Sequence, residues 1–332
     1  MSRTTVSYVL NGQKGQRIPI SPETRQRVLA AIADLGYEPD ARAQSLRSGA
    51  TKTIGVLVPL YENPFFWQIL RGISSEAEAA GYSLLLSHSS LTPEQELQSL
   101  RELAQQRVDG LILLMGFKLL PAKILKQLRK SDRPIVQIAS TGSEFDHVLQ
   151  GYAEGTRALM AYLFELGHRR IGFVYGVAEA SQGYDRLLTY RYILNEAGLL
   201  DEALIQECGP TLEDGYQAAR RLLSRPNRPT ALLVINDLLG MAVVRAAADL
   251  GLSIPGDVSV ASFDDIPFAS YTVPRLTTVS GQPEQNGRDA VTLLLKRLNG
   301  PDRPREIISA GWQLIIREST GPAPTSSSDR SP

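Results

Sequence analysis

The stretch LRSGATKTIGVLVP, residues 46–59, joins two parts of the chain that have different sequence patterns. From Thr53 onward, short apolar runs alternate with segments of helical spacing. Runs of this kind, separated by helices, indicate parallel strands that are buried on both faces of a sheet. Residues 2–52 contain only short helical patterns and a basic linker. The junction therefore predicts a small helical module followed by a large α/β domain.

The α/β pattern occurs twice. The first series begins with TIGVLVP at 53–59 and continues through YSLLLS, VDGLILL and PIVQIA. The second begins near Gly151 and continues through RIGFVYG, TALLVI and DVSVASF. The predicted fold class is α/β, with two doubly wound parallel-sheet lobes in tandem. We expect ligand contacts at the carboxyl ends of the strands, which face the cleft between the lobes.

The N-terminal module carries two helical patterns. In the second, Ser21 suits the N-cap and Pro22 the first helical position. Its apolar residues recur at helical spacing: Val28, Leu29, Ile32 and Leu35. The preceding segment turns Val6, Val9 and Leu10 inward and leaves another face for side chains that can reach bases and phosphates, namely Arg3, Thr4, Ser7 and Tyr8. A helix pair at the start of an ordinary enzyme fits the same pattern.

The net charge of zero hides an asymmetry between the two parts. Residues 1–52 hold eight basic and four acidic side chains, a net charge of +4, and residues 53–332 carry −4. The positive part can neutralise phosphates, and the acidic body disfavours unspecific wrapping of nucleic acid. A solvated basic helix is the alternative interpretation.

Two longer strings make a family resemblance specific. SRTTVSYVLNG, and after it ISPETRQRVLAAIADLGYEPDARAQSLRSGATKTIGVLVP, closely resemble the DNA-binding and hinge region of the LacI/GalR family of bacterial transcriptional regulators. Similarity continues to about residue 318 through NPFF, RVDGLILL, ELGHRRIGFVYG, PTALLVINDLLGMAVVRA and DVSVASFDDIPFASYTVPRLTTV. The resemblance implies a DNA-binding repressor whose affinity for a palindromic operator is controlled by a small-molecule effector, with no cofactor and no enzymatic activity.

The resemblance also implies a domain division. Residues 1–38 are expected to form a partial helix-turn-helix headpiece, 39–52 a hinge helix, and 53–320 an effector-binding and dimerisation domain like the periplasmic binding proteins. Lobe 1 would comprise about 53–149 and 279–307, and lobe 2 about 150–278 and 308–320. Residues 321–332, GPAPTSSSDRSP, lack core-forming side chains and are expected to be disordered.

Family members contact the operator through the recognition helix and the hinge. By resemblance the contacting residues are Arg3, Thr4, Thr5, Ser7, Tyr8, Asn11, Arg42, Ala43, Leu46 and Arg47. The short hinge helix would order only against DNA or a partner hinge. Leu46 corresponds to the side chain that wedges a base step open in the minor groove. A linker with an incidental leucine is the alternative.

The start of the chain departs from the family. Members usually carry a first helix and an alanine-rich turn before the recognition helix, and Met1 falls where many have the valine of a GVS turn. We therefore expect the chain to begin inside the helix-turn-helix. A soluble solute-binding or sensor protein without a functional DNA-binding head is the second candidate function. In-frame codons upstream of Met1 that encode the missing helix would favour the repressor.

The effector contacts implied by the resemblance lie at strand ends: Phe65, Phe66, Arg186, Asn236 and Asp264. An amide and a carboxylate can bracket adjacent sugar hydroxyls, so a carbohydrate is the expected effector. Helix-start packing is the alternative for Phe65, and an exposed helix position is the alternative for Arg186. Asp237 is expected to cap a helix.

Three features depart from the family pattern in this site. Ala139 and Ser140 stand where many members have an acidic sugar ligand. Gln150 and Gly151, in VLQGY, replace a VDN-like sequence, and Thr189 replaces a glycine and is expected to narrow the pocket. The chemistry of the effector is therefore not given by the family resemblance.

A palindromic operator matches a two-fold protein, so we expect a homodimer. The helix after NPFF, with Ile69, Ile73 and Ala77, and the helix after Gly281 are expected to supply the interface of lobe 1. No leucine heptads follow Glu318, so a tail-mediated tetramer is not expected.

The sequence also argues against other classes of protein. It has no apolar run near the length of a membrane span and no leader pattern, and Cys208 stands alone, so we expect a cytoplasmic protein without disulfides or cysteine-ligated metal. No GxSxG elbow, P-loop or metal-spaced histidine pair appears. His168 follows the helix-ending Gly167 and is expected to pack or to contact the helix end. Asp264 and Asp265 are neighbours and are expected to point apart.

Overall fold

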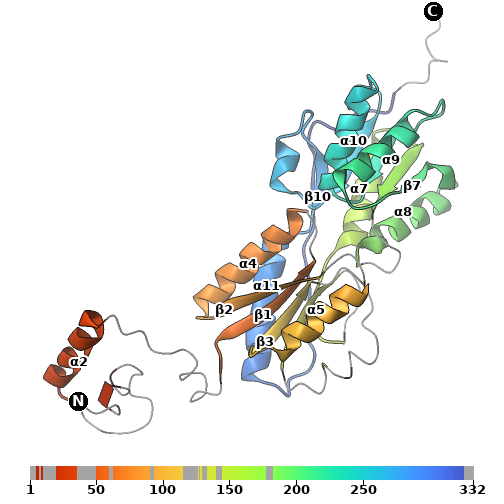
Figure 1. Ribbon diagram of the computed structural model, residues 1–332. Coiled ribbons are helices and arrows are strands. Elements are labelled where there is room, and N and C mark those ends of the chain that lie inside the picture. Colours follow the sequence, from red (N-terminus) through yellow and green to blue (C-terminus); the bar gives the residue numbers. More distant parts are fainter. Residues whose placement is uncertain are drawn as a thin grey trace, which may run out of the picture. The chain divides into compact units, whose positions relative to one another are not determined.

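The chain forms two compact units, Met1–Thr51 and Lys52–Pro332. The computed structural model describes residues 5, 6, 9, 20–35, 50–59, 63–89, 93–114, 126, 128, 133–139, 144–176 and 182–324. Figure 1 draws the helices and strands of both units. No helix in this described part of the chain is long and apolar enough to cross a membrane.

The first unit contains helix α2, Pro22–Asp34, which begins as the sequence predicts. The Ser21 hydroxyl accepts a hydrogen bond from the amide of Thr24 at 3.2 Å, and Pro22 is the first helical residue. Val28 is buried, but Leu29 and Leu35 are exposed, so the apolar face expected for this helix is wrong at these two positions. A small helical module has too little surface to cover a full apolar stripe.

Most of the expected operator contacts lie outside the described residues: Arg3, Thr4, Ser7, Tyr8, Asn11, Arg42, Ala43, Leu46 and Arg47. Thr5 is described, and it is helical and half-buried. Val9 is buried, in agreement with the predicted inward face of this segment.

The second unit consists of two lobes, each built on one six-stranded sheet. The lobe 1 sheet has the order β11-β5-β4-β3-β1-β2, and its described strand pairs are all parallel. Its strands are β1 (Thr53–Pro59), β2 (Ser83–Ser89), β3 (Gly110–Leu114), β4 (Ile135–Ala139), β5 (Asp146–Leu149) and β11 (Ile307–Ser309).

The lobe 2 sheet has the order β12-β10-β9-β8-β6-β7. Its strands are β6 (Ile171–Tyr175), β7 (Ile205–Glu207), β8 (Ala231–Val234), β9 (Ser259–Phe263), β10 (Thr277–Ser280) and β12 (Gln313–Ile315). Its described strand pairs are parallel except that β12 runs antiparallel to β10. The two doubly wound lobes predicted from the sequence are confirmed.

Both faces of the lobe 1 sheet are covered by helices (Figure 1). Along β1, Ile54 and Val56 join the apolar cluster that includes α4 (Phe65–Ala79) and α11 (Pro283–Asn299). Leu57 joins the cluster on the other face, with α5 (Pro93–Gln105). This burial on both sides explains why the strands are apolar runs rather than alternating ones.

In lobe 2 the helices pack in two pairs, α7 with α8 and α9 with α10. Their bounds are α7 Tyr152–Glu165, α8 Asp185–Glu196, α9 Leu212–Leu223 and α10 Asp237–Asp249. Three short 3-10 helices complete the described elements of this lobe: η1 (Gln182–Tyr184), η2 (Glu202–Leu204) and η3 (Pro267–Ser270).

The chain passes between the lobes three times, after β5, after β10 and after β11. The end of the chain then adds to lobe 2. The Gly321 amide donates to the Ser259 hydroxyl at 3.0 Å, and the Ala323 amide donates to the Leu166 carbonyl at 2.8 Å. The expectation of a disordered tail from residue 321 is therefore wrong for these residues, because they supply partners to α7 and β9; residues 325–332 lie outside the described part.

His168 has the packing role expected for it. Its ring is fully buried, and its Nδ1 lies 2.9 Å from the Thr230 hydroxyl while its Nε2 lies 3.0 Å from the Gly321 carbonyl. Burial lowers the pKa of this imidazole. The neutral ring thus joins α7, β8 and the end of the described chain.

The three residues expected in a dimer face on α4 are wrong, whereas an interface that α4 and α11 supply stays a prediction. Ile69, Ile73 and Ala77 are buried, because α4 packs closely on α11 of the same chain. Two glycines allow this approach: a Cβ atom on Gly72 would overlap the carbonyl of Glu284, and one on Gly287 would overlap the carbonyl of Ile69. The apolar stripe of α4 thus belongs to the core of lobe 1, which a periodicity pattern cannot distinguish from an interface.

The replacement Gly287→Ala should destabilise lobe 1 by about 1–3 kcal/mol, the usual cost of forcing a methyl group into a packed contact. The clash is with backbone, which cannot rotate away as a side chain can. Urea unfolding followed by circular dichroism measures the loss. Gly300→Ala is the control, since a Cβ there would meet its nearest neighbour at 3.7 Å. Equal stability of the two variants would contradict this account of the helix contact.

Candidate functional site

The Asp264 carboxylate joins the two lobes. Asp264 directly follows β9 and is buried. Its Oδ2 accepts a hydrogen bond from the side-chain amide of Asn63 at 2.9 Å, and its Oδ1 lies 3.6 Å from Nη1 of Arg186. Asn63 follows β1 of lobe 1, whereas Asp264 and Arg186 belong to lobe 2. Two strand ends therefore meet at one carboxylate.

Arg186 is held in place by its own lobe. It is the second residue of α8 and is buried, so the interpretation as an exposed helix arginine is wrong. Its Nη1 donates to the Ile235 carbonyl at 2.7 Å, and its Nε donates to the Gly183 carbonyl at 3.2 Å. The guanidinium carbon lies 4.0 Å from the centroid of the Tyr152 ring. A carboxylate and an aromatic face thus compensate the buried cation.

Asn236 and Asp237 follow β8, and the prediction that Asp237 caps the next helix is wrong. Asn236 is the N-cap of α10, and its Oδ1 accepts from the amide of Leu239 at 2.9 Å. An N-cap residue has extended backbone, which Asn236 has with φ of −158°, whereas Asp237 is already the first helical residue. Asp237 turns into the protein and is fully buried.

Phe65 and Phe66 begin α4, directly after the Asn63-Pro64 segment. The Phe65 amide donates to Oδ1 of Asn63 at 3.0 Å, and the two phenyl rings meet edge to face at 5.4 Å between centroids. Phe65 is buried in the core and Phe66 is half-buried. Helix-start packing, the alternative named for Phe65, describes its position here, and its contact with an effector stays a prediction.

Sequence reasoning missed Asn63 and Tyr152. Asn63 follows the carboxyl end of β1 and immediately precedes Pro64. This position after a buried strand was the signal from which the sequence could have identified it. Tyr152 is the first residue of α7, and its buried ring lies against Arg186 and edge-on to Phe263 at 6.4 Å. No local pattern distinguishes this tyrosine from an ordinary core aromatic.

The three departures from the family pattern have different surroundings. Gly151 is the N-cap of α7, and Gln150 beside it is half-buried. Thr189 is buried one turn after Arg186 on α8. The Ala139 side chain and all of Ser140 lie outside the described part of the structure.

This region contains two buried carboxyl groups, of which only Asp264 pairs with the buried Arg186. Burial raises the pKa of Asp264, while Arg186 and Asn63 oppose the rise. Burial and the neighbouring Asp264 raise the pKa of Asp237 to about 8. The site thus contains one acid paired with arginine and one acid that is neutral at pH 7.

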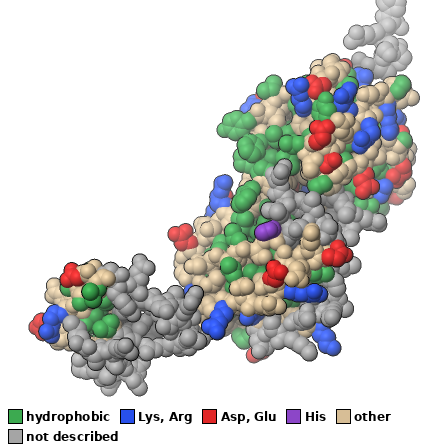
Figure 2. Space-filling model, in the orientation of Figure 1, with side chains coloured by type: hydrophobic (Ala, Val, Ile, Leu, Met, Phe, Trp, Pro, Cys, Tyr) green, Lys and Arg blue, Asp and Glu red, His purple; other side chains and the backbone are tan. Residues whose placement is uncertain are grey.

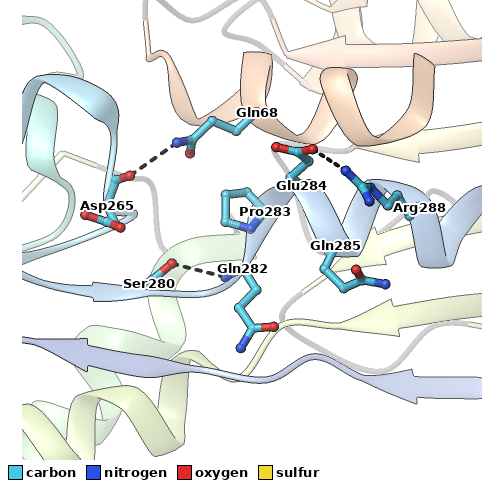
Figure 3. Close-up of a pocket in the computed structure, with 8 residues that line it drawn as sticks. All are labelled: Gln68, Asp265, Ser280, Gln282, Pro283, Glu284, Gln285 and Arg288. Carbon is cyan, nitrogen blue, oxygen red and sulfur yellow. Dashed lines mark hydrogen bonds and ion pairs between the residues drawn. The ribbon is translucent and has the colours of Figure 1, made fainter. Parts of the chain in front are cut away.

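Asp265 has different partners from Asp264, as expected for neighbouring residues. Its carboxylate lies 2.6 Å from Arg317, and its carbonyl accepts from the Gln68 side chain of α4 at 3.2 Å. It lines a hollow of about 320 Å³ with Gln68, Ser280, Gln282 and the first turns of α11 (Figure 3). Among the described residues, no group of three or more His, Cys, Asp or Glu could hold a metal ion.

Comparison with known proteins agrees with both units. Residues 1–40 match bacterial regulatory proteins of the lacI family, and residues 160–320 match the periplasmic binding protein-like domain. The chain is similar to the HTH-type transcriptional repressor PurR of Photobacterium profundum, with 32% identity over 324 residues that cover 96% of this chain and 95% of that protein.

Two solved structures are similar along nearly the whole chain. The Lac repressor dimer bound to operator and the anti-inducer ONPF gives a TM-score of 0.83 at 26% identity, covering 96% of this chain and 95% of that one. The complex of the transcriptional regulator CelR with cellobiose gives a TM-score of 0.72 at 30% identity, covering 96% of both chains. The expectation that the chain begins inside the helix-turn-helix stays a prediction. Because the PurR relative is 32% identical over 96% of this chain, the chain belongs to the LacI family of bacterial regulatory proteins. Members of this family are DNA-binding transcriptional repressors with an effector-binding core, and they are not enzymes.

Proposed function

We propose that the effector of this repressor is a carbohydrate or sugar derivative, bound between the lobes by Phe65, Phe66, Arg186, Asn236 and Asp264. The observation that carries the proposal is the buried Asp264 carboxylate, which lies between a guanidinium and an amide. Carboxylate, guanidinium and amide groups can together bracket adjacent hydroxyls. The cellobiose bound to the related CelR supports this class of ligand.

Effector binding would act by changing contacts between the lobes. In this structure Asn63 and Gln68 of lobe 1 bond to Asp264 and Asp265 of lobe 2. A sugar hydroxyl that replaces Asn63 or Arg186 at the Asp264 carboxylate would break one contact and form others. The ligand shifts the equilibrium only if it binds the two lobe arrangements with different affinity.

Operator binding would use the N-terminal unit. The proposed contacts on the recognition helix are Arg3, Thr4, Thr5, Ser7, Tyr8 and Asn11, and those on the hinge are Arg42, Ala43, Leu46 and Arg47. The net charge of +4 on residues 1–52 supports a role against phosphates. A palindromic operator would place two such units one helical turn apart.

A homodimer would bring those two units together. On lobe 2, Tyr271 and Val273 follow η3 with 85% and 89% of their surface exposed, and Phe268 lies beside them. Figure 2 shows hydrophobic side chains gathered on this edge of lobe 2. Trp67, on the outer side of α4, is 65% exposed. Exposed apolar patches of this kind mark protein interfaces, and the related Lac repressor is a dimer.

Arg186→Ala should abolish the response to the effector and leave operator affinity unchanged, because the arginine lies in the core and far in sequence from the DNA-binding unit. A panel of mono- and disaccharides that includes cellobiose is first screened by the rise in Tm. Operator binding isotherms with and without the selected sugar then compare the variants. Arg191→Ala, on the same helix and paired with Glu202, is the control. A normal response of Arg186→Ala would show that the pocket is assigned wrongly.

Leu46→Ala should lose about 1–3 kcal/mol of specific operator binding, as is typical for a single specificity position. Binding to a scrambled duplex should barely change, since nonspecific binding comes from the charges of basic side chains. Isotherms on both duplexes at one salt concentration measure the two losses, and Arg47→Ala should weaken both. If Leu46→Ala weakens both duplexes equally, or neither, Leu46 is only part of a linker.

Val273→Glu should convert the dimer to a monomer, because a carboxylate would be buried in the apolar contact without a partner. Sedimentation velocity at micromolar concentration reports the change. Leu188→Glu introduces the same charge at an exposed leucine on α8 and should leave the dimer intact. A wild-type monomer, or a Val273→Glu dimer, would refute the assignment of this face.

A further inference from the structure

Asp237 is fully buried and ties together four segments of lobe 2. Its Oδ1 accepts hydrogen bonds from the hydroxyls of Ser262 in β9 and Thr278 in β10, the latter at 2.7 Å. Its Oδ2 accepts from the amide of Ile266 at 2.8 Å. Asp237 itself begins α10. One carboxyl group therefore links α10, two strands of the sheet and the turn that carries Asp264.

That turn has an unusual backbone. Asp264 has φ of 105° and Asp265 has φ of 52°, values that residues other than glycine seldom adopt. Such a backbone persists only where its surroundings determine it. The bond from Ile266 to Asp237 holds one end of the turn, and the Asp264 amide donates to the Val279 carbonyl at 2.9 Å.

Both sides of the turn make contacts that matter for the effector site. On one side Asp264 reaches Arg186 and Asn63. On the other, the Asp265 carbonyl accepts from Gln68 of lobe 1 at the hollow of Figure 3. The conformation of three residues thus sets the position of the site carboxylate and one contact between the lobes.

We infer that Asp237, which does not itself reach the cleft, is the positioning residue of the effector site: its carboxyl group holds the turn that presents Asp264 to Arg186. The inference deepens the proposed function and depends on it only for the identity of the ligand. The geometry of the turn and of Arg186 is open to measurement without any ligand.

The charges around Asp237 explain why the neutral acid suits this position. Ser262 and Thr278 face it with hydroxyl groups only, from β9 and β10. The carboxylate of Asp264 acts on it from the turn, and Arg186 of α8 is engaged with that carboxylate. The remaining charges near the turn, Asp265 and Arg317, pair with each other. Because Asp237 is neutral, it does not compete with Asp264 for the positive charge of Arg186.

The protonation of Asp237 determines whether the stability of the protein rises or falls with pH. Burial raises the pKa of Asp237 from 3.8 to about 8, so the folded chain keeps a proton that the unfolded chain releases. The stabilisation linked to this proton is complete below pH 3.8 and is lost as the pH rises through about 8. In the neutral acid the proton on Oδ1 can be donated to one of the two hydroxyls, which then rotates to accept it. Asp237→Asn is the neutral replacement of the same shape: its carbonyl can accept from Ile266, and its NH₂ can donate to both hydroxyls once they rotate to accept.

The first measurement is urea unfolding of the full chain between about pH 5 and pH 9, for wild type and Asp237→Asn. The stability of Asp237→Asn relative to wild type should rise with pH over this range. A pH-independent difference would show that Asp237 is a hydrogen-bond acceptor without a proton and would overturn this part of the inference. Because both proteins contain His147 and His168, the contributions of these histidines to the pH dependence of stability cancel in the difference.

The second measurement is the NMR resonance of the Arg186 Nε–H group, identified by its absence in Arg186→Lys. It should titrate with a midpoint near pH 8 in wild type, stay at the low-pH position in Asp237→Asn, and shift in Asp237→Ala. Asp257→Asn, which removes a half-buried acid bonded to Ser253, should leave it unchanged. An unchanged resonance in Asp237→Ala would overturn the positioning role.

If Asp237→Ala does not fold, Ser262→Ala replaces it, since it removes one of the three bonds to the same carboxyl group. Its Arg186 resonance should shift in the same direction, and an unchanged resonance would contradict the inference. Neither measurement uses a sugar or an operator. A chain that binds no carbohydrate would therefore refute the proposed effector and leave these results as they are.

Discussion

The need to compensate the buried carboxylate of Asp264 constrains the rest of the core. An unpaired charge in a protein interior costs several kcal/mol, so partners must be brought to it. Arg186 comes from the start of α8, and Asn63 comes from lobe 1. This group thus supplies one of the bonds between the lobes and a partner for the start of α8. A ligand that enters the site must take over its bonds, which makes the carboxylate a suitable point of control.

The helix that receives the interlobe contacts is part of a rigid body. Gln68 lies on α4, next to Ile69 and one turn before Gly72, where the backbone of α4 touches α11. Close backbone contact leaves no room for α4 to slide independently on the sheet. A change at Gln68 is therefore transmitted to α4 and α11 together. The same packing leaves only the outer side of α4 for contact with another subunit.

The chemistry of this site is distributed differently from the family pattern that the sequence resembles. Ala139 and Gly151 stand where many members have acidic or amide side chains, whereas Asn63, which belongs to the shared NPFF motif, bonds to Asp264. The ring of Tyr152 lies against the guanidinium of Arg186. The family fold is thus preserved, while positions 139 and 151 depart from the family pattern.

The sequence alone determined the alternating strands and helices, the start of α2 after its N-cap Ser21, and the position of Asp264 at the end of a strand. These features follow from local periodicity, capping chemistry and the rule that ligands bind at the carboxyl ends of parallel strands. The family resemblance, not the residue pattern, pointed to Arg186. Tertiary structure decided that the stripe of Ile69 and Ile73 is internal, that Asn236 rather than Asp237 caps α10, and that Asn63 meets a carboxylate 201 residues away. Those outcomes depend on backbone angles and on contacts between distant segments, and neither is encoded in the spacing of residues along one helix or strand.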